Sequence, residues 1–292
     1  MDFSVGGGGF RSQHVEECPD IGPVCDSVAV APYQHDLEIV TGDLALGVRY
    51  GFAPGFGLEA LVAWRVNRQE ITFRTLEGAP FTPDPPDVHH ADRTLSGFAD
   101  PWLLVAYGRH AGAWSWGARA GASLPVGSTV EDPFALGDLG VPHEHVQLGS
   151  GTVQPMVGLG MNRGFDGWTA TLSGIARFGV ATNGHGYRPG DQVIARAFAT
   201  SALGVPRATF ALGPTLFHET SETWQGHVAS EGNLGRTDLY AEGRATWTPP
   251  GWGAALGGEL RVPLWSEATG AQVDVPVSFR LWLSTTFGES TP

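Results

Sequence analysis

The chain has 292 residues, a formal net charge of −13 and only 16 % charged residues. The excess of acidic residues argues against nucleic acid as a partner, because phosphate backbones attract basic surfaces. No apolar run approaches the roughly 18 residues of a membrane-spanning helix, although strands that hide their hydrophobicity by alternation can still form a spanning barrel.

The first predicted element is the segment DFSVGGGGFRSQ, which alternates weakly and contains the glycine run from Gly6 to Gly9. It is either a strand or a flexible leader or plug. We expect the strand, because a sheet that crosses lipid must close and leave no open edge. The chain starts without a basic and apolar leader, so we expect no signal peptide and a mature form of the protein. We also expect residues 1–292 to form a single domain.

Two cysteines, Cys18 and Cys25, follow in the stretch HVEECPDIGPVC. Their C-x6-C spacing is not that of a usual zinc pair, and it suits a small disulfide-closed loop in an oxidising compartment. The alternatives are two free thiols, or two metal ligands accompanied by His14 and His35. We predict the disulfide.

From about Glu38 to Phe287 the chain forms eleven segments in which apolar and polar residues alternate, as in a strand with one apolar face. In order they are DLALGVRYGF, FGLEALVAWRVN, DPWLLVAYG, AWSWGARAGASLPV, TVQPMVGLGMN, WTATLSGIARFGV, QVIARAFATSALG, ATFALGPTLFHE, RTDLYAEGRATW, WGAALGGELRVPLW and VDVPVSFRLWLSTTF. Short turns such as APG alternate with long polar loops, which is typical of outer-membrane barrels with tight periplasmic turns and longer extracellular loops. The first segment completes the even number of strands that a closed up-and-down barrel requires.

Aromatic residues gather beside the short turns and at the end of the last strand. They are Tyr50, Phe52, Tyr107, Trp114, Trp116, Trp168, Trp247, Trp252 and Phe287. A ring of tryptophan and tyrosine at one level indicates a membrane interface, whereas a soluble sandwich has no reason to place tryptophan there. A last strand that ends on Phe287 also resembles the signal read by the outer-membrane assembly machinery, although the tail GESTP follows it here.

The predicted fold class is therefore all-β, a transmembrane up-and-down antiparallel β-barrel of about twelve strands. We expect it in the bacterial outer membrane, in contact with membrane lipid and lipopolysaccharide.

Two stretches resemble one family within this class. SGFADPWLLVAYG is similar to the small-residue and acidic start of a strand in the outer-membrane transporters associated with meta-pathway phenol degradation. GASLPVGS is similar to the strand of that family that ends in a Leu-Pro-x-Gly turn before a long loop. The family usually has Gly-Asp where this chain has Ala99 and Asp100. The resemblance implies passive uptake of small molecules, aromatic ones included, and supplies no catalytic residues.

Charged residues occupy the predicted inner face of the strands. The candidate pore-lining residues are Arg49, Arg65, Arg119, Arg177, Arg196, Arg244, Arg261, Arg280, Asp43, Glu59, Asp100, Glu242 and Glu259. They predict either a water-filled lumen whose charges select a small-molecule solute, or a network of ion pairs that blocks a narrow barrel. Glu242 and Arg244 on one strand and Glu259 and Arg261 on its hairpin partner can meet directly or diagonally. Inward glycines leave space, which favours a channel.

Histidines concentrate in the predicted extracellular loops. VHH contains His89 and His90, and PHEH contains His143 and His145. With their acidic neighbours they could collect a transition metal. No spacing among them forms a recognised ligand set, and polar loops commonly contain histidine, so we expect no metal and no cofactor.

An enzyme is the third alternative, because some small barrels are lipid hydrolases. HVASEGN offers His227, Ser230 and Asn233, but a base and a nucleophile must lie within hydrogen-bond reach of each other. A solvated loop is the simpler interpretation, and we expect the chain not to be an enzyme.

Overall fold

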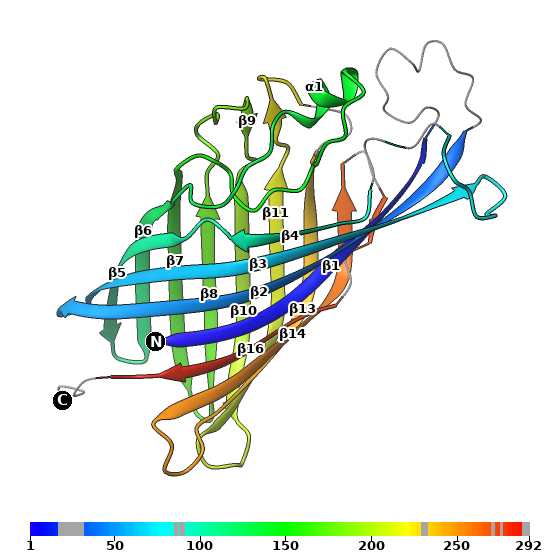
Figure 1. Cartoon of the computed structure of the whole chain (residues 1–292). Coiled ribbons are helices and arrows are strands. Elements are labelled where there is room, and N and C mark those ends of the chain that lie inside the picture. The colour runs from blue at the N-terminus through cyan, green and yellow to red at the C-terminus, as the bar shows by residue number, and fades with distance from the viewer. Residues whose placement is uncertain are drawn as a thin grey trace.

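The computed structural model describes residues 1–16, 32–84, 87, 91–228, 233–269, 272–274 and 277–287. Most described strands belong to one antiparallel sheet that curves round and closes on itself (Figure 1). They are β1 (Asp2–Glu16), β2 (Tyr33–Ala53), β3 (Phe56–Thr75), β4 (Arg93–Phe98), β5 (Trp102–Ala111), β6 (Trp114–Ser123), β7 (Gln154–Phe165), β8 (Trp168–Arg177), β10 (Gln192–Ala202), β11 (Ala208–Thr220), β13 (Gly235–Trp247), β14 (Ala254–Ala268), β15 (Gln272–Asp274) and β16 (Ser278–Thr285).

These described segments form a closed barrel of 12 strands, because β4 and β5 succeed each other along β3, and β15 and β16 succeed each other along β1. Strand β1 closes the barrel. Its Gly6 lies opposite Asp43 of β2 on one side and Arg280 of β16 on the other. The amino group of Met1 donates a hydrogen bond to the carbonyl oxygen of Thr285 at 2.7 Å. The predicted first strand and the predicted fold class are both confirmed.

The glycine run lets β1 approach both neighbours closely. A Cβ atom at Gly6 would lie 2.9 Å from the carbonyl oxygen of Phe279, and one at Gly9 only 2.3 Å from that of Ile39. Larger residues at these positions would push the neighbouring strands away. The glycines that weaken the sequence pattern therefore allow the wall to close, because β1 pairs with β2 on one side and with β16 on the other. A sheet that crosses lipid requires such closure.

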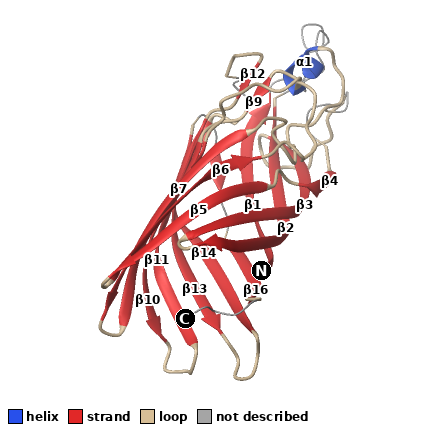
Figure 2. Cartoon of the chain, turned by 90° about the vertical axis from the view of Figure 1, so that its left-hand side faces the viewer, coloured by secondary structure: helices blue, strands red, loops and turns tan. Residues whose placement is uncertain are grey.

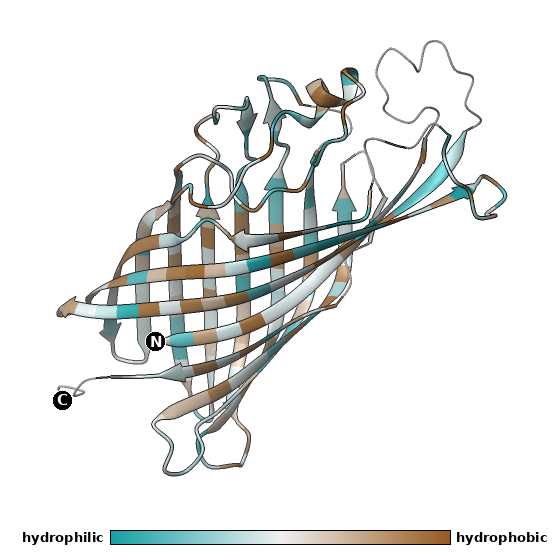
Figure 3. Cartoon of the chain, in the orientation of Figure 1, coloured by the Kyte–Doolittle hydropathy of each residue, from teal (hydrophilic) through white to brown (hydrophobic). Residues whose placement is uncertain are grey.

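The outer surface of the barrel is apolar. On β16 the side chains of Phe279, Leu281 and Leu283 are exposed, while the positions between them turn inward. Figure 3 shows the same alternation of apolar and polar residues along other wall strands. A soluble protein would bury the apolar face, whereas a transmembrane barrel turns it towards lipid.

Short turns and long loops lie at opposite ends of the barrel (Figures 1 and 2). The turns between β2 and β3 and between β7 and β8 contain Gly55 and Gly167, with φ of 77° and 79°, a conformation that glycine adopts without strain. The loop end carries helix α1 (Pro133–Asp138) and a second sheet made of β9 (Tyr187–Arg188) and β12 (Thr223–Trp224).

No helix within the described ranges is long and apolar enough to cross a membrane.

Aromatic side chains mark the short-turn end, as the sequence predicts. Trp114 and Trp247 are exposed on the outer surface. Tyr107 is partly covered, because its ring centroid lies 4.7 Å from that of Phe56 and 5.7 Å from that of Trp116. The short-turn end therefore has the belt expected at a membrane–water interface.

Candidate functional site in the barrel lumen

The inner wall carries arginines held by carboxylates on neighbouring strands. On β2 and β3, Asp43 and Arg65 stand opposite each other. The two oxygens of Asp43 accept hydrogen bonds from Arg65 Nε at 2.8 Å and from Arg65 Nη2 at 3.0 Å. This two-pronged pairing fixes the guanidinium plane against the wall.

A second group forms nearer the short turns. Glu59 of β3 lies 3.5 Å from Arg49 Nε on β2 and 3.1 Å from Arg119 Nη1 on β6. Strand β5 lies between β3 and β6 in the sheet, so the Arg119 side chain spans it on the inner face. One carboxylate thus holds two arginines.

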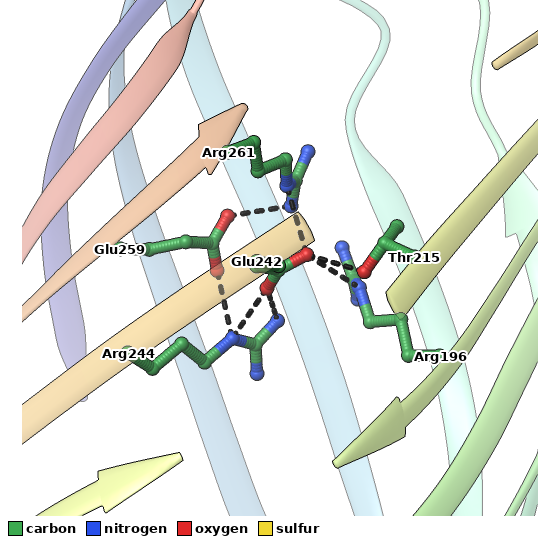
Figure 4. Close-up of polar contacts among 6 residues, drawn as sticks. All are labelled: Arg196, Thr215, Glu242, Arg244, Glu259 and Arg261. Carbon is green, nitrogen blue, oxygen red and sulfur yellow. Dashed lines mark hydrogen bonds and ion pairs between the residues drawn. The ribbon is translucent and has the colours of Figure 1, made fainter. Parts of the chain in front are cut away.

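The largest group, which we call the Glu242 cluster, consists of Arg196, Thr215, Glu242, Arg244, Glu259 and Arg261 (Figure 4). Register places Glu242 opposite Arg261, and Arg244 opposite Glu259. Glu242 accepts hydrogen bonds from Thr215 Oγ1 at 2.6 Å, Arg261 Nε at 3.0 Å and Arg244 Nε at 2.6 Å. Glu259 lies 3.0 Å from Arg244 Nε, and Arg196 Nε lies 3.6 Å from Glu242. The predicted meeting of the two hairpin partners is found, both directly and along one strand.

Side-chain exposure in the Glu242 cluster is graded. Glu242 is 0 % exposed, whereas the side chains of Arg196, Arg244 and Arg261 are 24 %, 31 % and 21 % exposed. The three guanidinium groups therefore cover the carboxylate and present their own surface to the lumen. With two carboxylates for three arginines, the cluster carries a formal charge of +1 when all its members are ionised.

A continuous row of residues links this cluster to Asp43 and Arg65. Glu259 stands opposite Arg280 on β16, Arg280 opposite Gly6 on β1, and Gly6 opposite Asp43. Positive and negative residues alternate along the row apart from Gly6. Arg280 is exposed and forms no ion pair with any described residue. It is the unneutralised member of the row.

Two other predicted pore-lining residues, Arg177 and Asp100, lie at the loop end of the wall. Arg177 Nη2 donates a hydrogen bond to Gln192 Oε1 at 2.5 Å, and Gln192 in turn donates one to Glu219. This chain joins β8, β10 and β11 where the strands end. Within the described ranges, Arg177 therefore forms no ion pair and reaches the Glu219 carboxylate through Gln192.

Asp100, which lies between β4 and β5, anchors a loop. Its Oδ1 accepts hydrogen bonds from the backbone N–H groups of Val126 at 3.0 Å and Gly127 at 2.9 Å. Its Oδ2 accepts from Ser150 N and from Ser150 Oγ, both at 2.8 Å. Both ends of the 124–153 loop are thus held by one carboxylate. The stretches SGFADPWLLVAYG and GASLPVGS therefore meet at this contact.

The same loop covers part of the inner wall. The buried side chain of Leu148 lies against Gly97 of β4, where a Cβ atom would be 3.0 Å from Leu148 Cδ1. Gly97 stands opposite Arg65 and shares its inward direction. Arg93 on β4 forms an ion pair with Glu144 of the loop at 2.5 Å. The loop therefore narrows the lumen at the loop end of the barrel.

An aromatic group, which we call the aromatic cap, lies above the barrel wall. The Trp224 ring centroid is 4.8 Å from that of Tyr187 and 6.3 Å from that of Phe134. Trp224 Nε1 donates a hydrogen bond to Glu222 Oε1 at 3.1 Å. Burial raises the pKa of the Glu222 carboxyl above its usual value, and it also raises the pKa of the Tyr187 hydroxyl. Sequence reasoning missed this group, because its members come from three separate loops.

Of the candidate metal-binding histidines, the structure describes His143 and His145. His143 is buried, with Nδ1 2.9 Å from the carbonyl oxygen of Val141, and its ring centroid lies 5.1 Å from that of His145. Within the part of the chain that the structure describes, no group of three or more His, Cys, Asp or Glu could hold a metal ion. The remaining candidates Cys18, Cys25, His89, His90 and Ser230 lie outside the described residues.

No protein-family model matches the chain, and no curated protein matches it in sequence. Solved structures do match. One match is the crystal structure of the COG4313 outer membrane channel from Pseudomonas putida F1. The alignment covers 97 % of this chain and 96 % of the channel, with a TM-score of 0.57 and 14 % sequence identity. A second match is the crystal structure of the transport unit of the autotransporter AIDA-I from Escherichia coli. The alignment covers 98 % of this chain and 90 % of the transport unit, with a TM-score of 0.50 and 8 % sequence identity. At these identities the likeness shows a shared fold.

The chain is an outer-membrane-type β-barrel. Its closed wall and apolar outer surface place it in the bacterial outer membrane. The short turns then face the periplasm and the long loops face the cell exterior.

Proposed function

We propose that the protein is a channel for the passive uptake of small molecules, with small aromatic or hydrophobic compounds as the favoured solutes. The observation that carries this proposal is the accessibility of the inward arginines. The side chains of Arg65, Arg119 and Arg244 are 35 %, 40 % and 31 % exposed although all three lie on the inner face of a closed barrel. A plug in the barrel would bury these three side chains. Because they are accessible, there is room for water beside them.

The wall contacts give the lumen a fixed polar surface. Ion pairs hold most of the guanidinium groups flat against the strands, which keeps long side chains out of the central space. Charged side chains that line a pore select solutes by charge and hydrogen bonding. The lumen can therefore admit small neutral or anionic molecules while the loop between β6 and β7 restricts their size.

The preference for aromatic solutes rests on two supports. The stretches around Asp100 and Gly127 resemble transporters associated with phenol degradation, and in this structure they are in direct contact. The aromatic cap of Phe134, Tyr187 and Trp224 lies on the extracellular side, where a solute would arrive. Aromatic rings offer stacking surfaces for such a solute.

Liposome swelling with neutral sugars of increasing size and with phenols tests the proposal. A matched pair of variants gives it an internal control. Gly160 faces the lumen, since it stands opposite Gly117 in the row next to Arg119, and a Cβ atom there meets nothing closer than 3.7 Å. Its neighbour Leu159 faces lipid. We expect Gly160→Trp to slow swelling and Leu159→Trp to leave it unchanged. Equal swelling rates for the two variants, or no swelling with the unmodified protein, would contradict the proposal.

A further inference from the structure

The lipid-facing wall contains a groove of about 570 Å³ over β7, β8, β10 and β11. This volume lies within the range of about 300–1,000 Å³ that is usual for ligand sites. Its lining includes the small side chains of Ala170, Ala197 and Ala199, which we call the alanine floor, and the larger side chains of Leu172 and Leu212.

Register shows that the groove opens to lipid and not to the lumen. Ala170 stands opposite Ala199, and Ala199 stands opposite the exposed Leu212. The neighbouring residue Thr171 points the other way, because its hydroxyl donates a hydrogen bond to Asn162 Oδ1 at 2.7 Å on the inner face. The groove is therefore a depression in the outer surface of the barrel.

One basic residue lies at the periplasmic end of the groove. Arg163 stands opposite Ala170, three residues before the short turn at 166–167. Its guanidinium carbon lies 5.0 Å from the ring centroid of Trp114 and 4.8 Å from that of Phe165. The Phe165 ring stacks on Trp168 at 4.2 Å with an interplanar angle of 6°. Aromatic side chains thus hold an arginine at the level of the interfacial belt.

No described carboxylate forms an ion pair with Arg163. Among the described residues it forms no ion pair and no side-chain hydrogen bond, and it is exposed on the outer surface. A guanidinium group at the edge of hydrocarbon is costly unless it reaches the interface or meets a compensating group. Its planar donors match the geometry of a phosphate.

We propose that this groove is a binding site for one phospholipid of the periplasmic leaflet. Its phosphodiester accepts hydrogen bonds from Arg163, and one acyl chain lies on the alanine floor towards the middle of the bilayer. Charge complementarity selects the phosphate, and the depth of Trp114 and Trp168 sets the headgroup at the interface. Pro214 lines the groove beside Gly213 and has no N–H to donate to the hydrogen bonds between strands. Regular strand pairing is therefore interrupted at the place where the acyl chain of the lipid would lie.

Native mass spectrometry of the full chain released from phospholipid nanodiscs tests the site. Arg163→Gln removes the charge, and Arg109→Gln is its control, because Arg109 is an exposed arginine near the same end and stands opposite Trp116. Ala197→Phe fills the groove, and Ala195→Phe is its control, because Ala195 has the same outward direction on β10 and does not line the groove.

We expect one bound phospholipid on the unmodified protein and on both controls. Occupancy should fall at least about tenfold in Arg163→Gln, the loss expected for one charge-assisted hydrogen bond, and it should also fall in Ala197→Phe. Diacylglycerol with the same acyl chains should not bind. Folding of each variant is checked by the heat-dependent gel mobility of the barrel. Equal lipid occupancy in all variants, binding of diacylglycerol at the level of phospholipid, or no bound lipid on the unmodified protein would overturn the proposal.

Discussion

Glu242 of β13 and Arg261 of β14 stand opposite each other on the inner wall, with a carboxylate oxygen of Glu242 3.0 Å from Arg261 Nε. Glu242 is fully buried beneath this arginine and its neighbours, so its charge is balanced inside the protein and not by water. The pair joins adjacent strands and leaves the guanidinium surface facing the lumen. The Glu242 cluster thereby shapes the wall as well as its charge.

The variant Glu242→Gln should lower the free energy of unfolding by about 3–5 kcal/mol, the usual cost of removing one partner from a buried ion pair. Three arginines would then share the single carboxylate of Glu259. Urea unfolding in lipid vesicles, followed by tryptophan fluorescence, measures the change.

Glu59→Gln is the matched control for this variant. Its partners Arg49 and Arg119 have side chains that are 70 % and 40 % exposed, so water replaces the lost contact, and the expected loss is below about 1 kcal/mol. Equal losses for the two variants would show that burial of Glu242 does not govern the stability of the wall.

Arg280 should set the ionic preference of the channel. It is the inward arginine that lies in the row of alternating charges, next to Gly6, without an ion pair among the described residues. Arg280→Gln should shift the reversal potential, measured across a KCl gradient in a planar bilayer, towards lower anion permeability. Arg163→Gln is the control, because it removes the same charge from the lipid-facing side. A shift of the same size in the control would contradict the assignment.

Asp100→Ala should loosen the loop between β6 and β7 while the barrel stays folded. The substitution removes four hydrogen bonds, from Val126 N, Gly127 N, Ser150 N and Ser150 Oγ. Hydrogen–deuterium exchange should show lost protection at 126–127 and at 150, with the wall strands β7 and β8 unchanged. Asp100→Asn keeps one side-chain carbonyl oxygen that can accept hydrogen bonds, so its effect should be smaller. Unchanged protection of the loop in Asp100→Ala would show that the loop is held by other contacts.

The aromatic cap should become less stable as the pH rises. Burial raises the pKa of the Glu222 carboxyl above its ordinary value of 4.5 in the folded protein. The folded cap therefore binds more protons than the unfolded loop above about pH 4.5, and stability is lost as the pH rises towards the folded pKa. Exchange protection of 222–228, corrected for intrinsic rates, should be greater at pH 5 than at pH 8. In Glu222→Gln this difference should disappear, and if it persists another group is responsible.

The barrel was predictable from the sequence because each of its strands carries its own signal. Alternation around Phe279 and Leu281, aromatic residues beside the turns, and the regular change between short and long connections all depend on local sequence. The facing of Glu242 with Arg261 and of Arg244 with Glu259 followed from their parity, since residues at equal parity on hairpin partners share one face.

The contacts that depend on long loops were not predictable in this way. Asp100 has the inward parity of a pore-lining residue, yet it anchors a loop, because hydrogen bonds to Ser150 depend on how the intervening chain folds. The short helix α1 lies within one of the predicted long loops. Asp132 followed by Pro133 is nevertheless a recognisable helix start, and Asp132 Oδ1 accepts a hydrogen bond from Phe134 N at 3.1 Å. The disulfide between Cys18 and Cys25 stays a prediction.

Single-channel recording in planar bilayers shows whether the closed barrel encloses a continuous aqueous path. We expect discrete, reproducible conductance steps from protein that is folded by circular dichroism and by heat-dependent gel mobility, and smaller steps from Gly160→Trp. Folded protein that inserts into the bilayer and conducts no ions would show that the ion pairs and the loop held by Asp100 block the lumen, and that the protein is not a channel.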